Sequence, residues 1–245
     1  MPEIFHSPDL IIQEYAVGSF QTHCYFLINP DTRQLVIIDP GDDGDFLSEQ
    51  ILVQDLQLQA IILTHGHFDH VGAGLALRLN FPQALLILPQ ADEFIYSRGN
   101  GSADYFGVTL DPFAPPTHLV TINEEAHQPQ LTSYTKSTAS KSFPDHTTAT
   151  SVLPNWQWLA LPGHTPGHLG LYHPTHHVLI SGDTIFFGGD LGRTDFSYAD
   201  LPTLQQAIKK NILPLSDNTL ILPGHEELFT FNSAYRKFLT ISLNS

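Results

Sequence analysis

The sequence contains little cysteine and little positive charge. Cys24 is the single cysteine among 245 residues, which excludes an intramolecular disulfide and any cysteine-rich zinc or iron–sulfur site. Only 10 residues are Lys or Arg against 25 Asp or Glu, which gives a formal net charge of -15. Because phosphate binding depends on clustered basic residues, we expect no nucleic-acid partner. Any metal site must be built from histidine and carboxylate.

Long hydrophobic runs are also missing. No stretch reaches the roughly 18 apolar residues of a membrane span, and the amino terminus lacks the basic and apolar regions of a secretory signal. These features predict a cytoplasmic protein without a membrane partner. The apolar fraction of 42% is sufficient for the core of a globular protein of this length.

Histidine, by contrast, is abundant, with 14 residues in the chain. Histidine is the side chain that most often binds metals and is a frequent general base. Four potential ligands fall within six residues, at His65, His67, Asp69 and His70, directly after the short apolar run 60–63. A turn at the end of a buried strand can direct the first two side chains to one point and the other two to a second point. One short segment could therefore serve two metal ions.

Three further potential ligands have the same placement. His164, Asp183 and His225 each follow a predicted strand and lie beside glycine or proline residues that favour turns. For any one of these residues a structural role is a reasonable alternative. The repetition of the placement at four strand ends is difficult to obtain by chance, and it predicts one shared site.

The remainder of the chain alternates predicted strands and helices without an internal repeat or a linker, which indicates a single α/β (α+β) domain over residues 1–245. Strands are expected at 10–17, 24–28, 35–38, 60–63, 84–88, 156–161, 169–173, 178–181 and 219–222, and helices at 46–58, 71–79, 91–97, 202–212 and 232–241. Residues 99–150 are rich in Ser, Thr, Pro and Gly and poor in apolar runs. We expect a long loop or insertion there, either a mobile surface segment or a lid that shapes the active site.

The ordered pattern His-x-His-x-Asp-His, His, Asp, His resembles the metallo-β-lactamase superfamily over nearly the whole chain. This resemblance implies an αββα sandwich, in which two mixed β-sheets lie face to face between helices and the active site lies at one sheet edge. It also implies a ligand set for two metal ions. The first ion would be bound by His65, His67 and His164, the second by Asp69, His70 and His225, and Asp183 would bridge them.

Imidazole and carboxylate ligands suit Zn²⁺, Fe²⁺ or Mn²⁺, and we expect two divalent ions, with Zn²⁺ as the first choice. Metal ions can lower the pKa of a bound water from near 16 toward about 7. The sequence therefore predicts a hydrolase in which a metal-bound hydroxide attacks a carbonyl carbon of a small-molecule substrate. Asp69 is the predicted catalytic residue and would orient the nucleophile.

Within the superfamily, two stretches resemble glyoxalase II, the hydroxyacylglutathione hydrolases: Gly182-Asp183-Thr184-Ile185-Phe186 and Gly192-Arg193-Thr194-Asp195-Phe196. The resemblance implies cleavage of a thioester or ester. Persulfide dioxygenases, which use one iron, share the Gly-Arg-Thr-Asp stretch, so iron-dependent persulfide oxidation is the alternative. A lactonase or β-lactamase-type hydrolase is a further alternative.

Other polar residues have less specific interpretations. Arg193 could form an ion pair with Asp195 that holds its own loop, or it could bind the substrate. Cys24 lies in a predicted strand and is interpreted as a core residue. His23 has no assigned role. Because the family pattern uses His164, four other histidines are predicted to be non-ligands: His168, His173, His176 and His177.

Overall fold

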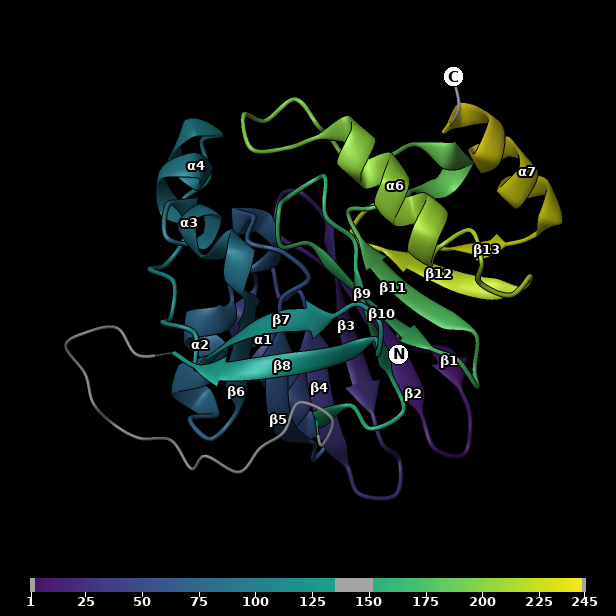
Figure 1. The fold of residues 1–245 in the computed structure, drawn as a ribbon. Helices are drawn as coiled ribbons and strands as arrows, with labels where there is room; N and C mark the ends of the chain where they lie inside the picture. Colours follow the sequence, from purple (N-terminus) through teal and green to yellow (C-terminus); the bar gives the residue numbers. More distant parts are fainter. Residues whose placement is uncertain (1–2, 135–151, 244–245) are drawn as a thin grey trace.

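Two β-sheets lie face to face in the computed structural model, which describes residues 3–134 and 152–243 (Figure 1). The first sheet has eight strands in chain order: β1 (Glu3–His6), β2 (Ile11–Val17), β3 (Thr22–Ile28), β4 (Gln34–Ile38), β5 (Gln57–Ile62), β6 (Leu85–Pro89), β7 (His118–Asn123) and β8 (Gln128–Ser133). The second has five, in the order β13 (Phe229–Phe231), β12 (Thr219–Pro223), β11 (Val178–Gly182), β10 (Leu169–His173) and β9 (Gln157–Ala160). Both sheets contain parallel and antiparallel pairs, as expected.

Strand β3 shows how the sequence builds a layer that is buried on both sides. Successive side chains of a strand point to opposite faces. Tyr25 and Leu27 accordingly pack in the core between the sheets, whereas Cys24 and Phe26 pack in the core on the outer face. All residues of β3 are buried. The prediction that Cys24 is a core residue is confirmed.

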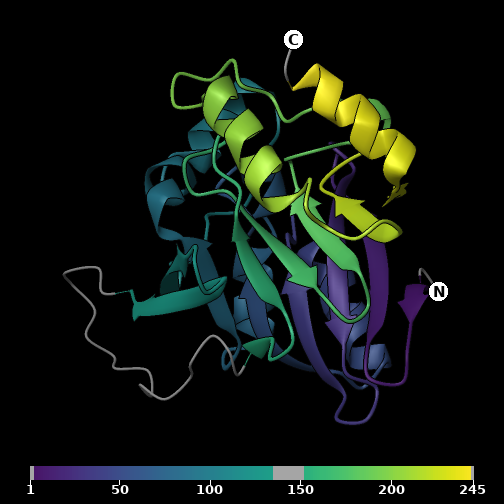
Figure 2. The ribbon, with the colours of Figure 1, turned by 45° about the vertical axis from the view of Figure 1, so that its right-hand side comes forward.

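Helices cover the outer face of each sheet, as Figures 1 and 2 show. On the first sheet, α1 (Gly44–Val53) and α2 (Gly74–Asn80) contribute buried apolar side chains to the outer core. On the second, α6 (Leu201–Asn211) and α7 (Ser233–Ser242) do the same. The layer order helix, sheet, sheet, helix confirms the predicted αββα sandwich.

The helix expected at 46–58 is too long. In the structure α1 ends at Val53 and β5 begins at Gln57. Leu58 pairs with Leu35 in the parallel register of β4 and β5. The apolar residues near the end of the predicted helix therefore belong to a turn and a strand, and the apparent helical spacing across this boundary is coincidental.

Residues 99–133 differ from the expected loop. They contain α4 (Gly99–Tyr105) and the β7–β8 hairpin, and β7 pairs in parallel with β6 so that the hairpin extends the first sheet. Many side chains of β8 are exposed, so its sequence lacks the apolar alternation that reveals a half-buried strand. Residues 135–150 of the expected loop lie outside the described residues. The choice between a mobile segment and a lid stays a prediction.

Parallel strands determine where the chemistry is placed. Strands β4 to β7 run in parallel, and so do β11 and β12. Because parallel strands bring their carboxyl ends to the same edge of a sheet, the loops after β4, β5, β6, β11 and β12 converge there. In the part of the chain that is described, no helix is long and apolar enough to cross a membrane.

Candidate metal centre

Three histidines from two sheets form the first group of potential metal ligands. His65 and His67 follow β5, and His164 follows β9. His67 Nδ1 lies 3.1 Å from His65 Nε2 and 3.0 Å from His164 Nε2. Tetrahedral ligands at zinc bond lengths lie about 3.3 Å apart. The three nitrogens therefore have nearly the spacing that a single bound ion would impose.

A second group lies next to the first and combines a carboxylate with two histidines. His225 Nε2 lies 3.3 Å from Asp69 Oδ2 and 3.3 Å from His70 Nε2. Asp69 and His70 belong to a short 3₁₀ turn at Phe68–His70, which brings both within reach of His225, while the His70 ring also contacts the His65 ring with centroids 4.1 Å apart. One local segment thus contributes to both groups, as the sequence predicts.

Asp183 lies between the two groups. Its Oδ2 is 3.6 Å from His164 Nε2 and 3.6 Å from His225 Nε2, and its Oδ1 is 3.5 Å from His70 Nε2. Oδ1 is buried and has no hydrogen-bond partner among the residues that the structure describes. Burying a carboxylate oxygen without a partner costs free energy. A metal ion bound to this oxygen would provide the missing partner.

The protonation of the three histidines of the first group, whose pKa values burial lowers, also fits a metal site. Burial and the adjacent His164 lower the pKa of His67 to about 3, and burial lowers the pKa of His65 well below its usual value. Both rings are therefore neutral at pH 7 and present a lone pair, as a ligand must. Three neutral imidazole nitrogens that face one another need a cation between them. The donor set fits two divalent ions of the zinc, iron and manganese class.

Three of the candidate ligand rings have a polar partner on their other nitrogen. His164 Nδ1–H donates to the carbonyl oxygen of Arg193 (2.8 Å), and His70 Nδ1–H donates to Asp39 Oδ2 (3.1 Å). His67 Nε2 lies 2.8 Å from the Tyr198 hydroxyl. Such partners fix the tautomer and direct the remaining nitrogen toward the metal.

Asp39 and Asp92 support the ligand loops, and neither was predicted as a site residue. Asp39 accepts hydrogen bonds from the backbone N–H of Thr64 (2.7 Å) and from its hydroxyl (2.6 Å), next to His65. Asp39 directly follows β4, so the strand-end signal that found the ligands could have found it too.

Asp92 joins the two ligand loops that supply the first group. Its Oδ2 accepts from the Gly66 N–H (3.0 Å) and the Thr165 hydroxyl (2.6 Å), and its Oδ1 accepts from the Gly167 N–H (2.6 Å). The carboxylate is fully buried. It therefore holds the loop of His65 against the loop of His164.

The predicted non-ligand His168 lies beside the centre. Its Nε2 accepts from the Asp183 N–H (3.0 Å), so the ring positions the bridging residue. His23, which had no assigned role, donates its backbone N–H to the Gly224 carbonyl (2.8 Å). Tyr25 donates its hydroxyl to the Pro223 carbonyl (2.6 Å). Strand β3 thereby supports the loop that carries His225.

The centre opens into a pocket of about 980 Å³ with an aromatic wall. Phe20 contacts Phe68 and Phe106, with ring centroids 5.3 and 6.0 Å apart. Arg193 lies on the rim and forms two hydrogen bonds with Asp195, at 3.0 and 2.7 Å. The ion pair of the first interpretation is thus present. Substrate contact by Arg193 stays a prediction. The aromatic side chains of the lining are Phe20, Phe68, Tyr105, Phe106, Phe186, Phe196 and Tyr198.

Comparisons with known proteins agree with this architecture. A family model described as the metallo-beta-lactamase superfamily matches residues 17–225. The hydroxyacylglutathione hydrolase GloC of Haemophilus influenzae is 34% identical, over 92% of this chain and 95% of its own. Among solved structures, the B3 metallo-beta-lactamase BLEG-1 has a TM-score of 0.74 and 31% identity, covering 94% of this chain and 99% of its own. TTHA1623, solved in a di-iron-bound form, has a TM-score of 0.70 and 28% identity, covering 90% of this chain and 98% of its own.

Proposed function

Since this chain belongs to the metallo-β-lactamase superfamily and is a metal-dependent hydrolase, we propose that it cleaves a thioester or ester in the manner of glyoxalase II. The proposal includes Zn²⁺ in both positions and the cytoplasmic location expected from the sequence. The observation that carries it is the pair of ligand groups joined by the unpartnered carboxylate of Asp183. The similarity to the GloC protein supports the choice of a thioester.

The residues of the centre divide the work of the reaction. When bound, the two ions would polarise the acyl carbonyl and lower the pKa of the attacking water. Asp69 then holds and orients that water through its carboxylate. Although burial opposes its charge, His70 and His225 lower the pKa of Asp69, so it is ionised and accepts a hydrogen bond at neutral pH.

The pocket wall indicates the chemistry of the substrate. The aromatic side chains face the cavity beside the ligands and form an apolar surface for an acyl or thiol portion of the substrate. Arg98 and Arg193 are the only arginine or lysine residues among its described lining residues. We propose that they attract a carboxylate of the substrate, which the otherwise acidic chain would repel.

The test combines metal analysis with a substrate panel. We expect two metal ions per chain and cleavage of thioesters, and we expect Asp69→Ala and His164→Ala to lose both bound metal and hydrolysis. His6→Ala, which changes an exposed histidine of β1, is the matched control and should behave as wild type. Wild-type metal content and hydrolysis in both variants would refute the site. One iron with oxygen uptake on a persulfide would refute hydrolysis.

β-Lactam hydrolysis is a second candidate. It is favoured by the 31% identity and the TM-score of 0.74 with the B3 metallo-beta-lactamase. The panel therefore includes β-lactams and lactones beside thioesters. A kcat/KM for a β-lactam above that for every thioester would replace the proposed substrate class while leaving the metal centre intact.

A further inference from the structure

A second cluster of potential metal ligands lies at the other end of the sandwich. Asp9 belongs to the turn between β1 and β2, whereas His173 is the last residue of β10 and His176 lies in the turn between β10 and β11. Strand β11 begins just after this turn and ends at Gly182, next to Asp183 of the metal centre, so its length separates the two clusters. The new cluster joins the edge of the first sheet to the second sheet.

The geometry of the three side chains is that of a ligand group. One ligand atom from each lies within 4.8 Å of the others. His176 Nε2 is 2.9 Å from Asp9 Oδ1 and 3.4 Å from the Ser7 hydroxyl, which donates to the same Asp9 oxygen at 2.8 Å. The rings of His173 and His176 have centroids 4.3 Å apart.

An ion pair between Asp9 and His176 does not explain the position of the His173 ring beside them. This ring is almost fully buried, and its closest polar contact is the His176 backbone N–H, 3.3 Å from Nδ1. Two adjacent imidazoles and one carboxylate provide the nitrogen and oxygen donors that a borderline divalent cation prefers.

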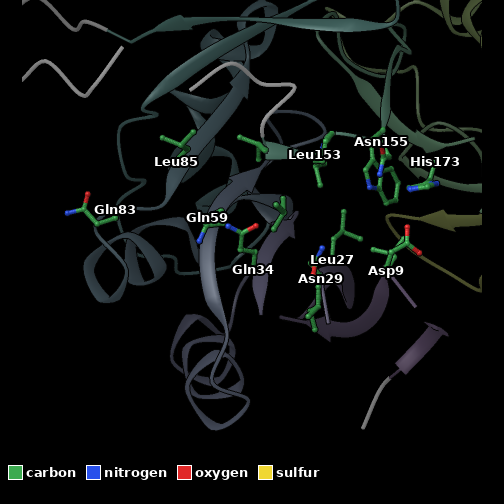
Figure 3. A pocket seen from close by; sticks show the side chains of 16 residues that line it. Asp9, Leu27, Asn29, Gln34, Gln59, Gln83, Leu85, Leu153, Asn155 and His173 are labelled. Carbon is green, nitrogen blue, oxygen red and sulfur yellow. The ribbon is translucent and has the colours of Figure 1, made fainter. Parts of the chain in front are cut away.

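The cluster is also accessible. Asp9 and His173 line a pocket of about 320 Å³ between the sheets, and Figure 3 shows both at the same side of it. Polar amide side chains line the same pocket, among them Asn29, Gln59 and Asn155. A hydrated ion could therefore enter and keep water ligands in addition to the three protein ligands.

We propose that Asp9, His173 and His176 bind a divalent transition-metal ion, best fitted by Zn²⁺, separately from the catalytic pair. The ion ties the β1–β2 turn to the β10–β11 turn and so stabilises the contact between the two sheets. Two histidines that the family pattern does not use thus become ligands of a structural site. The inference does not depend on which bond the enzyme hydrolyses.

The test uses the enzyme with zinc in its two catalytic positions, called the zinc-loaded enzyme, and conservative variants of the two more accessible ligands of the new cluster. Asp9→Asn and His176→Gln keep side-chain size and hydrogen-bonding capacity but weaken metal binding. In equilibrium dialysis against Zn²⁺ we expect a third zinc in wild type and only two in each variant. His6→Gln, the same substitution on an exposed histidine of β1, should keep the third zinc.

Thermal unfolding separates a metal site from an ordinary polar contact. Saturating Zn²⁺ should raise the Tm of the zinc-loaded wild type by about 2–6 °C and should leave the Tm of both ligand variants unchanged. A contact without metal would instead lower the Tm of the variants equally with and without added Zn²⁺. That result, or an equal third zinc in His176→Gln, would refute the site.

Tryptophan fluorescence reports on the location of the ion. The ring of Trp156 lies 5.2 Å from the ring of His173. Adding Ni²⁺ to the zinc-loaded enzyme should quench the fluorescence in wild type and in His6→Gln, and less in Trp156→Phe or His176→Gln. Thioester hydrolysis should change less than about twofold in the ligand variants. Quenching of the same size in wild type and all three variants would place the ion elsewhere.

Discussion

The floor and the wall of the catalytic pocket are built differently. The floor consists of the seven predicted ligands, which follow buried strands and are mostly oriented by buried partners. The wall consists of the aromatic side chains and arginines of the lining, which belong to turns and to α4. Phe20 and Phe106 are 42% and 46% exposed. The difference indicates that the floor fixes the chemistry, while the wall can vary and selects the substrate.

The largest effect is expected from a substitution that adds one methyl group to the floor. A Cβ at Gly224 would lie 2.2 Å from Asp183 Oδ1 and 2.7 Å from His70 Cε1. Gly224→Ala must therefore displace the bridging carboxylate or a ligand ring. We expect loss of bound metal and a fall in kcat/KM of more than about 100-fold, measured by metal analysis and steady-state kinetics.

The matched control is Gly74→Ala in α2, where an added Cβ meets only Leu86 at 3.8 Å. It should keep both metals and full activity. Full metal content in Gly224→Ala would show that the candidate ligands can shift to make room for a methyl group. The floor would then be no more rigid than the wall, and the proposed difference between them would be refuted.

The second effect concerns the support of the floor. In Asp92→Asn the amide nitrogen cannot accept a hydrogen bond, so at least one of the three donors held by this buried carboxylate loses its partner. We expect a loss of about 1–3 kcal/mol in the free energy of unfolding and a 10- to 100-fold weaker metal affinity. Denaturant unfolding and competition with a chelator measure the two. Glu49→Gln, the same kind of change at an exposed position, should alter neither the stability nor the metal affinity. Wild-type metal affinity in Asp92→Asn would show that the ligand loops keep their positions without this carboxylate.

The candidate ligands and the supporting residue Asp92 also show how far the sequence could predict the site. The candidate ligands were predictable because they are His and Asp residues that follow apolar strands, and four of them lie within six residues. Asp92 was not, because Gly66, Thr165 and Gly167 come from loops that only the folded chain brings together. Hydrogen bonds of this kind leave no local pattern in the sequence.

The fold shows the same limit. The central strands were predicted from buried apolar runs, whereas the αββα layers were expected only from the resemblance to the family. The β7–β8 hairpin was missed because backbone pairing holds it while its side chains are largely polar. Strand β13 was missed because it has only three residues. The wall of the pocket draws on α4, which lies within residues 99–150, where the sequence predicted no helix.

A moderate effect is expected in the wall. Phe106 contacts Phe20 and packs against Phe68 with centroids 5.8 Å apart. Phe106→Ala should raise KM about 5- to 10-fold for thioesters with an aromatic or long acyl group, because apolar contact area is lost. The kcat and the metal content should stay unchanged.

The acetyl thioester is the internal reference for this prediction, since a methyl group is too small to use the wall. Leu79→Ala removes an exposed apolar side chain from α2 and serves as the variant control. Equal losses for acetyl and aromatic substrates would mean that Phe106 supports the floor rather than selecting the acyl group.

The smallest effect is expected at the rim, where Arg193 pairs with Asp195. Both side chains are largely exposed, so the pair contributes little to stability and Arg193→Ala should shift the Tm by less than about 2 °C. If Arg193 binds a substrate carboxylate, its loss should raise KM about 3- to 10-fold for anionic thioesters but not for neutral ones. Asp195→Ala should lower KM for the same anionic substrates, because it frees the guanidinium. If the ion pair only holds its own loop, Arg193→Ala and Asp195→Ala must change KM in the same direction, and equally for anionic and neutral thioesters. Steady-state kinetics on the two variants therefore separates the two interpretations of Arg193.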